Sequence, residues 1–164
     1  MAKRSKGRSR TAGTADAQPA AADSALVAVR YIESSALVAA LLERDADALK
    51  SIRSKIKPIT SALTFAEAAR AIVRARVAER LTPDAERAAV RAMRRFERRC
   101  YVVSITDDVL ARVRRPFPVE PVRTLDAVHL ATAESLGELP QLITIVTRDD
   151  RVRDNAKALG YSVE

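Results

Sequence analysis

The sequence predicts a single α/β domain in which helices cover both faces of a central, mainly parallel sheet. Short β-branched runs alternate with longer helical patterns along the chain, and this order is typical of a parallel sheet. The length of 164 residues favours one domain over two. Hydrophobic residues make up 48% of the chain and aromatic residues only 4%, so we expect a core of aliphatic side chains.

The first half of the domain is predicted to contain two strands, each followed by helical segments. Runs of β-branched and apolar residues predict the strands, and apolar spacing near three and four predicts the helices. In chain order these elements are a strand at 25–32, a helix at 35–52, a short strand at 58–62, and helices at 64–80 and 83–98. The last helix has the clearest start, because Thr82 is a good N-cap and Pro83 suits the first helical position.

The second half is predicted to contain three strands and three further helices. In chain order these are a strand at 101–105, a short helix capped by Thr106, a helix at 125–136, a buried strand at 142–147, a helix at 150–159 and an edge strand at 161–163. Gly137 and Gly160 follow two of the helices and predict their ends. Three prolines within 114–123 exclude a helix there and predict a loop.

Residues 1–26 are predicted to be a disordered basic tail that precedes a folded domain at 27–164. The tail is rich in Ala, Ser, Gly and charge, so it has too little apolar surface to offset the entropy lost on ordering. The whole chain carries a formal net charge of +8, which favours an anionic partner such as nucleic acid. A basic arm that strengthens RNA binding is the alternative interpretation of the tail, but short basic tails are common and unspecific.

The rare residue types limit the kinds of site and the cellular location. A single cysteine, Cys100, excludes an internal disulfide framework and fits a reducing cytoplasm. With His129 as the only histidine, a zinc site is disfavoured, because zinc prefers several nitrogen or sulfur ligands. No stretch is long and apolar enough to span a membrane, and the N-terminus lacks the apolar core of a signal peptide. We therefore expect a cytoplasmic protein with no membrane partner.

Four carboxylates fall at strand ends or early in the following helices: Glu33, Glu67, Asp126 and Asp149. In parallel α/β folds such positions gather at the carboxyl ends of the strands. Clustered acids favour Mg²⁺ or Mn²⁺, which prefer oxygen ligands and can activate water to attack a phosphodiester. The pattern alone is weak evidence, because most acids lie on solvated faces. For Asp126 and Asp149 in particular, the alternative is a charge that interacts with a helix dipole.

Four blocks of sequence, in order, carry a resemblance to a known family. They read YIESSALV at 31–38, ITSALTFAEAARAI at 59–72, PVRTLDAVHLATA at 121–133 and IVTRDDRVRDNAKALGY at 145–161. Together they resemble the PIN-domain family, most closely the VapC-type toxins of bacterial toxin–antitoxin pairs, over nearly all of residues 29–164. The resemblance implies a three-layer α/β/α sandwich and a Mg²⁺- or Mn²⁺-dependent endoribonuclease. It also implies an RNA substrate, a VapB-like antitoxin and a homodimer.

The resemblance also assigns roles to individual residues. By this resemblance the metal-binding acids are Glu33, Glu67, Asp126 and Asp149. Ser35 and Thr147 match hydroxyl positions that support these ligands. Asp150 is a second candidate beside Asp149, which we prefer because it keeps the Thr-x-Asp spacing.

Glu33 departs from the family, whose first acid is typically Asp in a YLDTSALV-like motif. Glutamate carries the same charge on a stem one methylene longer, and Mg²⁺ demands near-ideal geometry. The site can accommodate the longer acid, favour Mn²⁺, or have lost much of its activity. We hypothesise that it still binds metal. The alternative function is a catalytically weak PIN-like module that binds RNA or a protein.

Three further features have alternative interpretations. His129 lies one helical turn after Asp126, and we expect a half-buried residue with one satisfied nitrogen rather than a ligand. Ten arginines lie within 70–99 and either track an RNA backbone or form a solvated helical face, which we favour for most of them. Arg123 suits a phosphate contact and a salt bridge equally well. A phosphatase is disfavoured, because no Asp-x-Asp pair follows the first strand.

Overall fold

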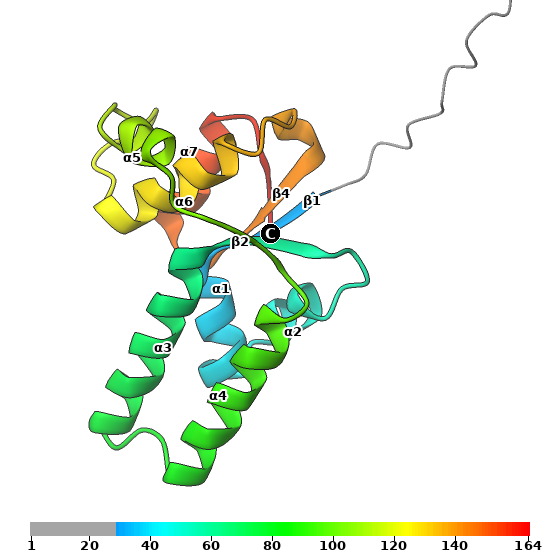
Figure 1. Cartoon of the computed structure of the whole chain (residues 1–164), viewed down its shortest axis with the longest axis vertical. Coiled ribbons are helices and arrows are strands. Elements are labelled where there is room, and N and C mark those ends of the chain that lie inside the picture. The colour runs from blue at the N-terminus through cyan, green and yellow to red at the C-terminus, as the bar shows by residue number, and fades with distance from the viewer. Residues whose placement is uncertain (1–28) are drawn as a thin grey trace, which may run out of the picture.

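A five-stranded parallel sheet forms the centre of the structure, a computed structural model that describes residues 29–164 (Figure 1). The strands are β1 (Val29–Ile32), β2 (Pro58–Ser61), β3 (Tyr101–Val103), β4 (Ile143–Val146) and β5 (Ser162–Val163). Their order is β3-β2-β1-β4-β5, and every neighbouring pair runs parallel. The predicted tail at 1–26 and the first part of the predicted strand at 25–32 lie outside the described residues.

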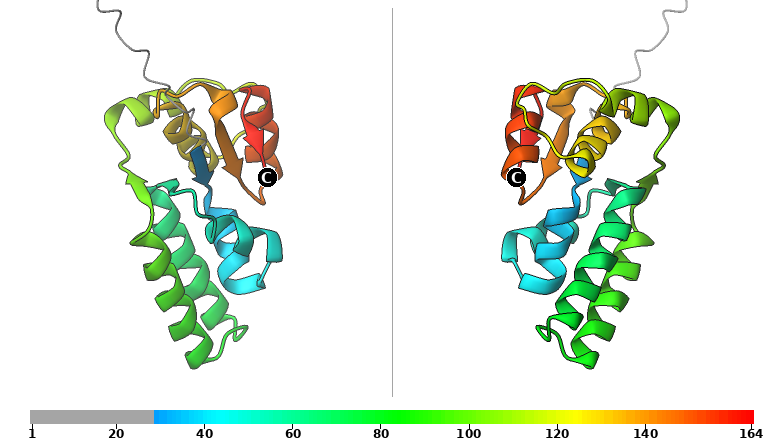
Figure 2. Two further views of the ribbon diagram at one scale, coloured as in Figure 1. Left: turned by 90° about the vertical axis from the view of Figure 1, so that its right-hand side faces the viewer. Right: turned by 90° about the vertical axis from the view of Figure 1, so that its left-hand side faces the viewer.

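Helices cover both faces of this sheet and make three layers. One layer consists of α1 (Ser34–Val38), a π-helical turn (Ala39–Glu43), α2 (Ala46–Ile52), α3 (Ala62–Val77) and α4 (Pro83–Glu97). The other consists of α5 (Asp107–Val113), α6 (Thr124–Glu134) and α7 (Asp150–Ala158), and a short 3₁₀ turn (Pro140–Leu142) precedes β4. Helices α3 and α4 form a hairpin that extends beyond the sheet (Figure 2). The predicted α/β/α sandwich is confirmed.

Two hydrophobic cores lie on the two faces of the sheet. In β1, Tyr31 belongs to the core under α5–α7, and Ile32 belongs to the core under α1–α4. Successive strand residues point to opposite faces, so one strand supplies both cores. Ile145 and Val146 alternate in the same way along β4. Both faces of β4 are therefore buried, which explains its nearly continuous apolar sequence, Ile-Thr-Ile-Val.

The predicted helix at 35–52 is wrong in one respect, because the chain breaks it near Arg44. Arg44 adopts a left-handed conformation with φ of 56°, and Asp45 caps the following helix by accepting a hydrogen bond from the Ala48 amide at 2.7 Å. An aspartate side chain competes for backbone donors and so favours a cap over a helix interior. Both halves pack into the same core, through Leu37 before the break and Ile52 after it. The apolar spacing consequently continues across the break and conceals it.

The predicted caps of the other helices agree with the structure. The hydroxyl of Thr82 accepts a hydrogen bond from the Ala85 amide at 3.2 Å, and Pro83 is the first residue of α4. Gly137 and Gly160 follow α6 and α7 with φ of 69° and 90°, which glycine adopts without strain. Among the described residues, no helix combines the length and apolarity that crossing a membrane requires.

Replacing Leu37 with alanine tests the core between β1 and the α1–α4 layer. Leu37 is fully buried, so Leu37→Ala should lower the free energy of unfolding by about 2–5 kcal/mol through lost burial and a cavity. Val77→Ala is the control, because Val77 is 78% exposed and should change stability by about 0.5 kcal/mol or less. Urea unfolding followed by circular dichroism measures both. Equal losses for the two variants would contradict the packing described here.

Candidate metal centre

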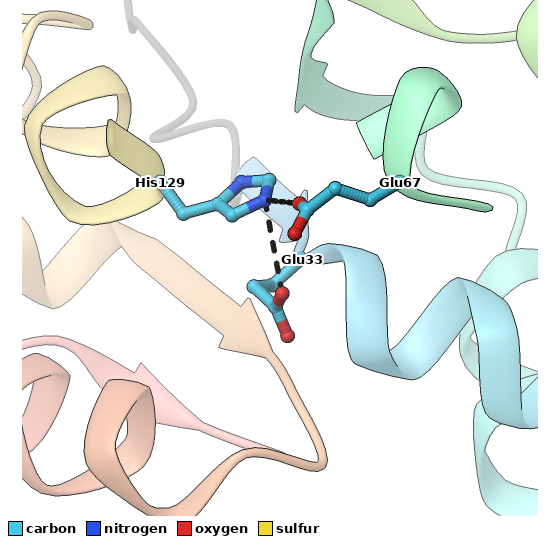
Figure 3. Close-up of side chains that lie close together, drawn as sticks. All are labelled: Glu33, Glu67 and His129. Carbon is cyan, nitrogen blue, oxygen red and sulfur yellow. Dashed lines mark hydrogen bonds and ion pairs between the residues drawn. The ribbon is translucent and has the colours of Figure 1, made fainter. Parts of the chain in front are cut away.

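The candidate site lies where the carboxyl ends of three adjacent strands meet, at β2, β1 and β4. Glu33 directly follows β1, Glu67 lies in the second turn of α3 after β2, and Asp149 follows β4 and precedes α7. Asp126 and His129 are contributed by α6, which belongs to the opposite helical layer. Figure 3 shows Glu67 and His129 approaching each other from these two layers above Glu33. Parallel strands place their carboxyl ends at one edge, so segments far apart in sequence converge here.

The carboxylate of Glu33 is 3% exposed and receives four hydrogen bonds. Oε1 accepts from the Ser34 hydroxyl at 2.6 Å. Oε2 accepts from the amide of Ser35 at 3.0 Å, from the Ser35 hydroxyl, and from the Thr147 hydroxyl at 2.8 Å. Three donors leave Oε2 little capacity for another ligand, whereas Oε1 retains a lone pair. Oε1 is therefore the atom of Glu33 that can face a cation.

His129 is fully buried with both ring nitrogens bonded, which corrects the expectation of a half-buried residue with one satisfied nitrogen. Its Nδ1 lies 3.1 Å from the Tyr31 hydroxyl, and its Nε2 lies 2.7 Å from Oε2 of Glu67. Burial, followed by the charge of Glu33, raises the pKa of Tyr31 well above its ordinary value, so this hydroxyl keeps its proton. Donation by Tyr31 to Nδ1 places the imidazole proton on Nε2, where it can be donated to Glu67.

The carboxylate of Glu67 is paired with His129 and is therefore not surrounded only by other acids. Partial burial acts to raise the pKa of Glu67, but the hydrogen bond and the electrostatic attraction of His129, with weaker contributions of Ser34 and Arg74, outweigh it and lower the pKa. Nε2 of His129 also lies 3.7 Å from Oε1 of Glu33. The acidic cluster therefore contains an imidazole that orients one of its carboxylates. Residue spacing placed His129 near Asp126, but it did not reveal this contact.

Asp126 has the least satisfied carboxyl group of the site. Its Oδ2 is buried and has no hydrogen-bond partner within the described part of the chain. Burial raises the pKa of Asp126, and the nearby charges of Asp149 and Glu33 raise it further. A buried, unpaired oxygen among other carboxylates is costly unless a cation offsets the charge. This residue fits the oxygen-rich donor set that a hard divalent cation prefers.

Asp149 and Asp150 have different surroundings although they are adjacent. Asp149 caps α7, and its Oδ1 accepts from the amides of Arg151 and Val152 at 2.8 and 3.3 Å. The alternative role of a helix-terminal charge thus applies to Asp149, which also lies close enough to Asp126 to raise its pKa. Asp150 has a side chain that is 95% exposed and pairs with Arg153 at 3.7 Å. The structure brings Asp149 to the site and leaves Asp150 outside it.

Ser35 and Thr147 connect Glu33 to the loop that carries Asp149. The Ser35 hydroxyl donates to Glu33 and accepts from the Arg148 amide at 2.7 Å. The Thr147 hydroxyl donates to Glu33 at 2.8 Å and accepts from the Asp149 amide at 3.0 Å. Each hydroxyl therefore makes one contact to the carboxylate and one to the backbone of the loop. Such contacts are typical of groups that orient metal ligands.

Three of these side chains lie closest together and form the compact part of the candidate donor set. One donor atom each from Glu33, Glu67 and His129 lies within 4.8 Å of the others. His129 already uses both nitrogens, so the oxygen atoms are the available ligands. Carboxylate oxygens suit Mg²⁺ or Mn²⁺ better than zinc. The chemistry that such a centre supports is the activation of water beside a phosphate.

Replacing Asp126 with asparagine should stabilise the metal-free protein at pH 7. The folded-state pKa of Asp126 lies above its unfolded value, so its ionised form disfavours folding. This loss of stability grows as the pH rises from the ordinary value of 3.8 through the raised pKa. We expect Asp126→Asn to have a higher Tm than the wild type in EDTA at pH 7, and the difference to shrink in acid. The exposed control Asp150→Asn should show no such gain, and a destabilised Asp126→Asn would contradict the raised pKa.

Comparisons with known proteins agree with this arrangement. Residues 30–158 match the family model of the PIN domain. Ribonuclease VapC35 of Mycobacterium tuberculosis is 37% identical over 137 residues, which cover 81% of this chain and 93% of that protein. Ribonuclease VapC46 of Mycobacterium tuberculosis H37Rv is 37% identical over 139 residues, which cover 84% of this chain and 97% of that protein. The chain therefore belongs to the PIN domain family.

Proposed function

We propose that this chain is a metal-dependent endoribonuclease and the toxin of a VapBC-like type II toxin–antitoxin system. Its similarity to two VapC ribonucleases over most of both chains supports this proposal. The observation that carries it is the buried Oδ2 of Asp126, which lacks a hydrogen-bond partner among the residues that the structure describes and lies near the charges of Glu33 and Asp149. A cluster of this kind needs a cation, and a cation among carboxylates suits phosphodiester hydrolysis.

We assign metal binding to the four acids of the site: Glu33, Glu67, Asp126 and Asp149. A bound Mg²⁺ or Mn²⁺ would polarise the phosphoryl oxygen and lower the pKa of a bound water. Glu33 would offer Oε1, because its Oε2 is occupied by three donors. His129 holds Glu67 in one orientation, and the lowered pKa of Glu67 keeps this carboxylate ionised at neutral pH.

The proposed partners follow from charge and family membership. RNA suits a chain with a net charge of +8, and binding would weaken with salt because phosphate contacts release counterions. A VapB-like antitoxin would bind the protein and block the site, and the active species would be a homodimer in the cytoplasm. The described residues include few aromatic side chains, so we expect recognition through phosphates and shape rather than base stacking.

Cleavage of RNA by the purified protein, freed of any partner, tests the proposed activity. We expect cleavage with Mg²⁺ or Mn²⁺, none with EDTA, and a loss of at least about 100-fold in Asp126→Asn, because that substitution removes a ligand charge. Asp150→Asn is the matched control and should retain activity, since this side chain lies outside the site.

A folded, metal-loaded protein that cuts no RNA would contradict this function. It would favour the alternative, a catalytically weak PIN-like module that binds RNA or a protein. The observation behind that alternative is the engagement of Glu33, whose carboxylate already accepts four hydrogen bonds.

Shortening Glu33 tests whether the longer acid is part of the site. Glu33→Asp draws the carboxylate back by about 1.5 Å, one carbon–carbon bond, relative to the other acids. Because Mg²⁺ requires near-ideal geometry, we expect at least a threefold change, about 0.65 kcal/mol, in Mg²⁺ affinity and a smaller change for Mn²⁺. Calorimetric titration measures both ions. Unchanged affinity and unchanged cleavage would show that position 33 is not a ligand.

A further inference from the structure

Arg148 lies between Thr147 and Asp149, and its guanidinium binds an aspartate of another segment. Its Nε lies 3.2 Å from Oδ2 of Asp45, and its Nη2 lies 2.9 Å from Oδ1 of the same carboxylate. Two parallel contacts of this kind fix orientation as well as distance. Nη1 of Arg148 also donates to the carbonyl of Thr147 at 3.2 Å. The Arg148 side chain thus contacts the backbone of its own β4–α7 loop and also links this loop to the start of α2.

Asp45 is a firm anchor for this contact. Its backbone amide donates to the Ala39 carbonyl at 3.2 Å, and its Oδ1 accepts from the Ala48 amide at 2.7 Å. These bonds exist because the chain breaks at Arg44, between the π-helical turn and α2. The break therefore presents a carboxylate toward the β4–α7 loop at a fixed place. A continuous helix through 35–52 would not place a capping aspartate here.

The backbone around Arg148 reaches the acidic cluster directly. Its amide donates to the Ser35 hydroxyl at 2.7 Å, and that hydroxyl donates to Glu33. The next amide, that of Asp149, donates to the Thr147 hydroxyl, which also donates to Glu33. A displacement of this loop would consequently alter both the Asp149 carboxylate and the bonds that orient Glu33.

We propose that the ion pair between Arg148 and Asp45 is a positioning device that holds the β4–α7 loop, and with it Asp149, at the metal centre. This inference rests on the proposed function, because it assumes that the acids bind a cation. Neither residue is one of the four acids to which metal binding is assigned. The pair is suited to this task because both side chains are partly buried, at 25% and 32% exposed, and their contact is two-pronged. Exposed single-contact pairs hold their groups far less firmly.

A double-variant cycle on the full-length protein, freed of any partner, tests this role through Mn²⁺ affinity measured by calorimetry without RNA. Arg148→Met keeps the aliphatic stem and removes the guanidinium, and Asp45→Asn keeps the helix cap and removes the charge. We expect each substitution to weaken Mn²⁺ binding by roughly threefold to tenfold, at or below the usual cost of losing a group that orients a ligand.

The double variant should bind Mn²⁺ no more weakly than the weaker-binding single variant, because both substitutions remove the same contact. Arg148→Lys, which can restore one contact, should recover part of the affinity.

Arg112→Met is the matched control for a purely structural effect. Arg112 pairs with Glu134 between α5 and α6, and these side chains are 17% and 28% exposed, similar to Arg148 and Asp45. This control should lower the Tm and leave Mn²⁺ affinity unchanged. Amide hydrogen exchange supplies a second readout, in which Arg148→Met should speed exchange over residues 147–152 and leave β1 unchanged.

Three results would overturn the positioning role: unchanged Mn²⁺ affinity in Arg148→Met, fully additive losses in the double variant, or an equal loss of affinity in Arg112→Met. Failure of the proposed function has a different outcome. A wild-type protein that binds Mn²⁺, loses affinity in Arg148→Met and yet cuts no RNA supports the positioning role and contradicts the nuclease. A wild-type protein that binds no Mn²⁺ contradicts both.

Discussion

The buried carboxylate of Glu33 joins the parts of the structure that make the site. A carboxylate that is 3% exposed must have hydrogen-bond donors, and its donors come from two separate segments. Ser34 and Ser35 belong to the first turn of α1, whereas Thr147 follows β4. Satisfying one side chain thus fixes the start of α1 against the loop that leads to α7. The positions of Arg148 and Asp149 follow from that junction.

The site also lies between the two helical layers, which explains how its charges are arranged. Glu67 reaches the cluster from α3 in one layer, and His129 reaches it from α6 in the other (Figure 3). Asp126 also belongs to α6. One carboxylate is paired with the imidazole, and one is held by hydroxyl and amide donors. Asp126 remains with a buried oxygen to which no residue of 29–164 makes a hydrogen bond. The fold tolerates this cost because the two cores on either side of the sheet supply the stability that the site does not.

Parallel topology makes this concentration of acids possible. Because β1 lies between β2 and β4 in the sheet, the carboxyl ends of these three neighbouring strands lie at the same edge. Each strand leads directly into a helix, so an acid just after a strand also lies near a helix N-terminus. Asp149 follows β4 and caps α7, and its charge also raises the pKa of Asp126. Structural capping and the proposed role in metal binding are therefore compatible in one residue.

Local patterns in the sequence predicted the succession of strands and helices along the chain, the caps at Thr82 and Thr106, and the positions of Glu33 and Asp149 just after strands. These features can be predicted from the sequence because periodicity and capping depend on neighbours within a few residues. Asp126 is different, because its helix α6 follows a loop and not a strand. The complete burial of His129, its pairing with Glu67 and the contact between Thr147 and Glu33 were decided only by tertiary structure. The contacts responsible join residues far apart in sequence: 62 positions separate Glu67 from His129, and 114 separate Glu33 from Thr147. Spacing along the chain carries no information about such pairs, because packing of the two layers against the sheet brings them together.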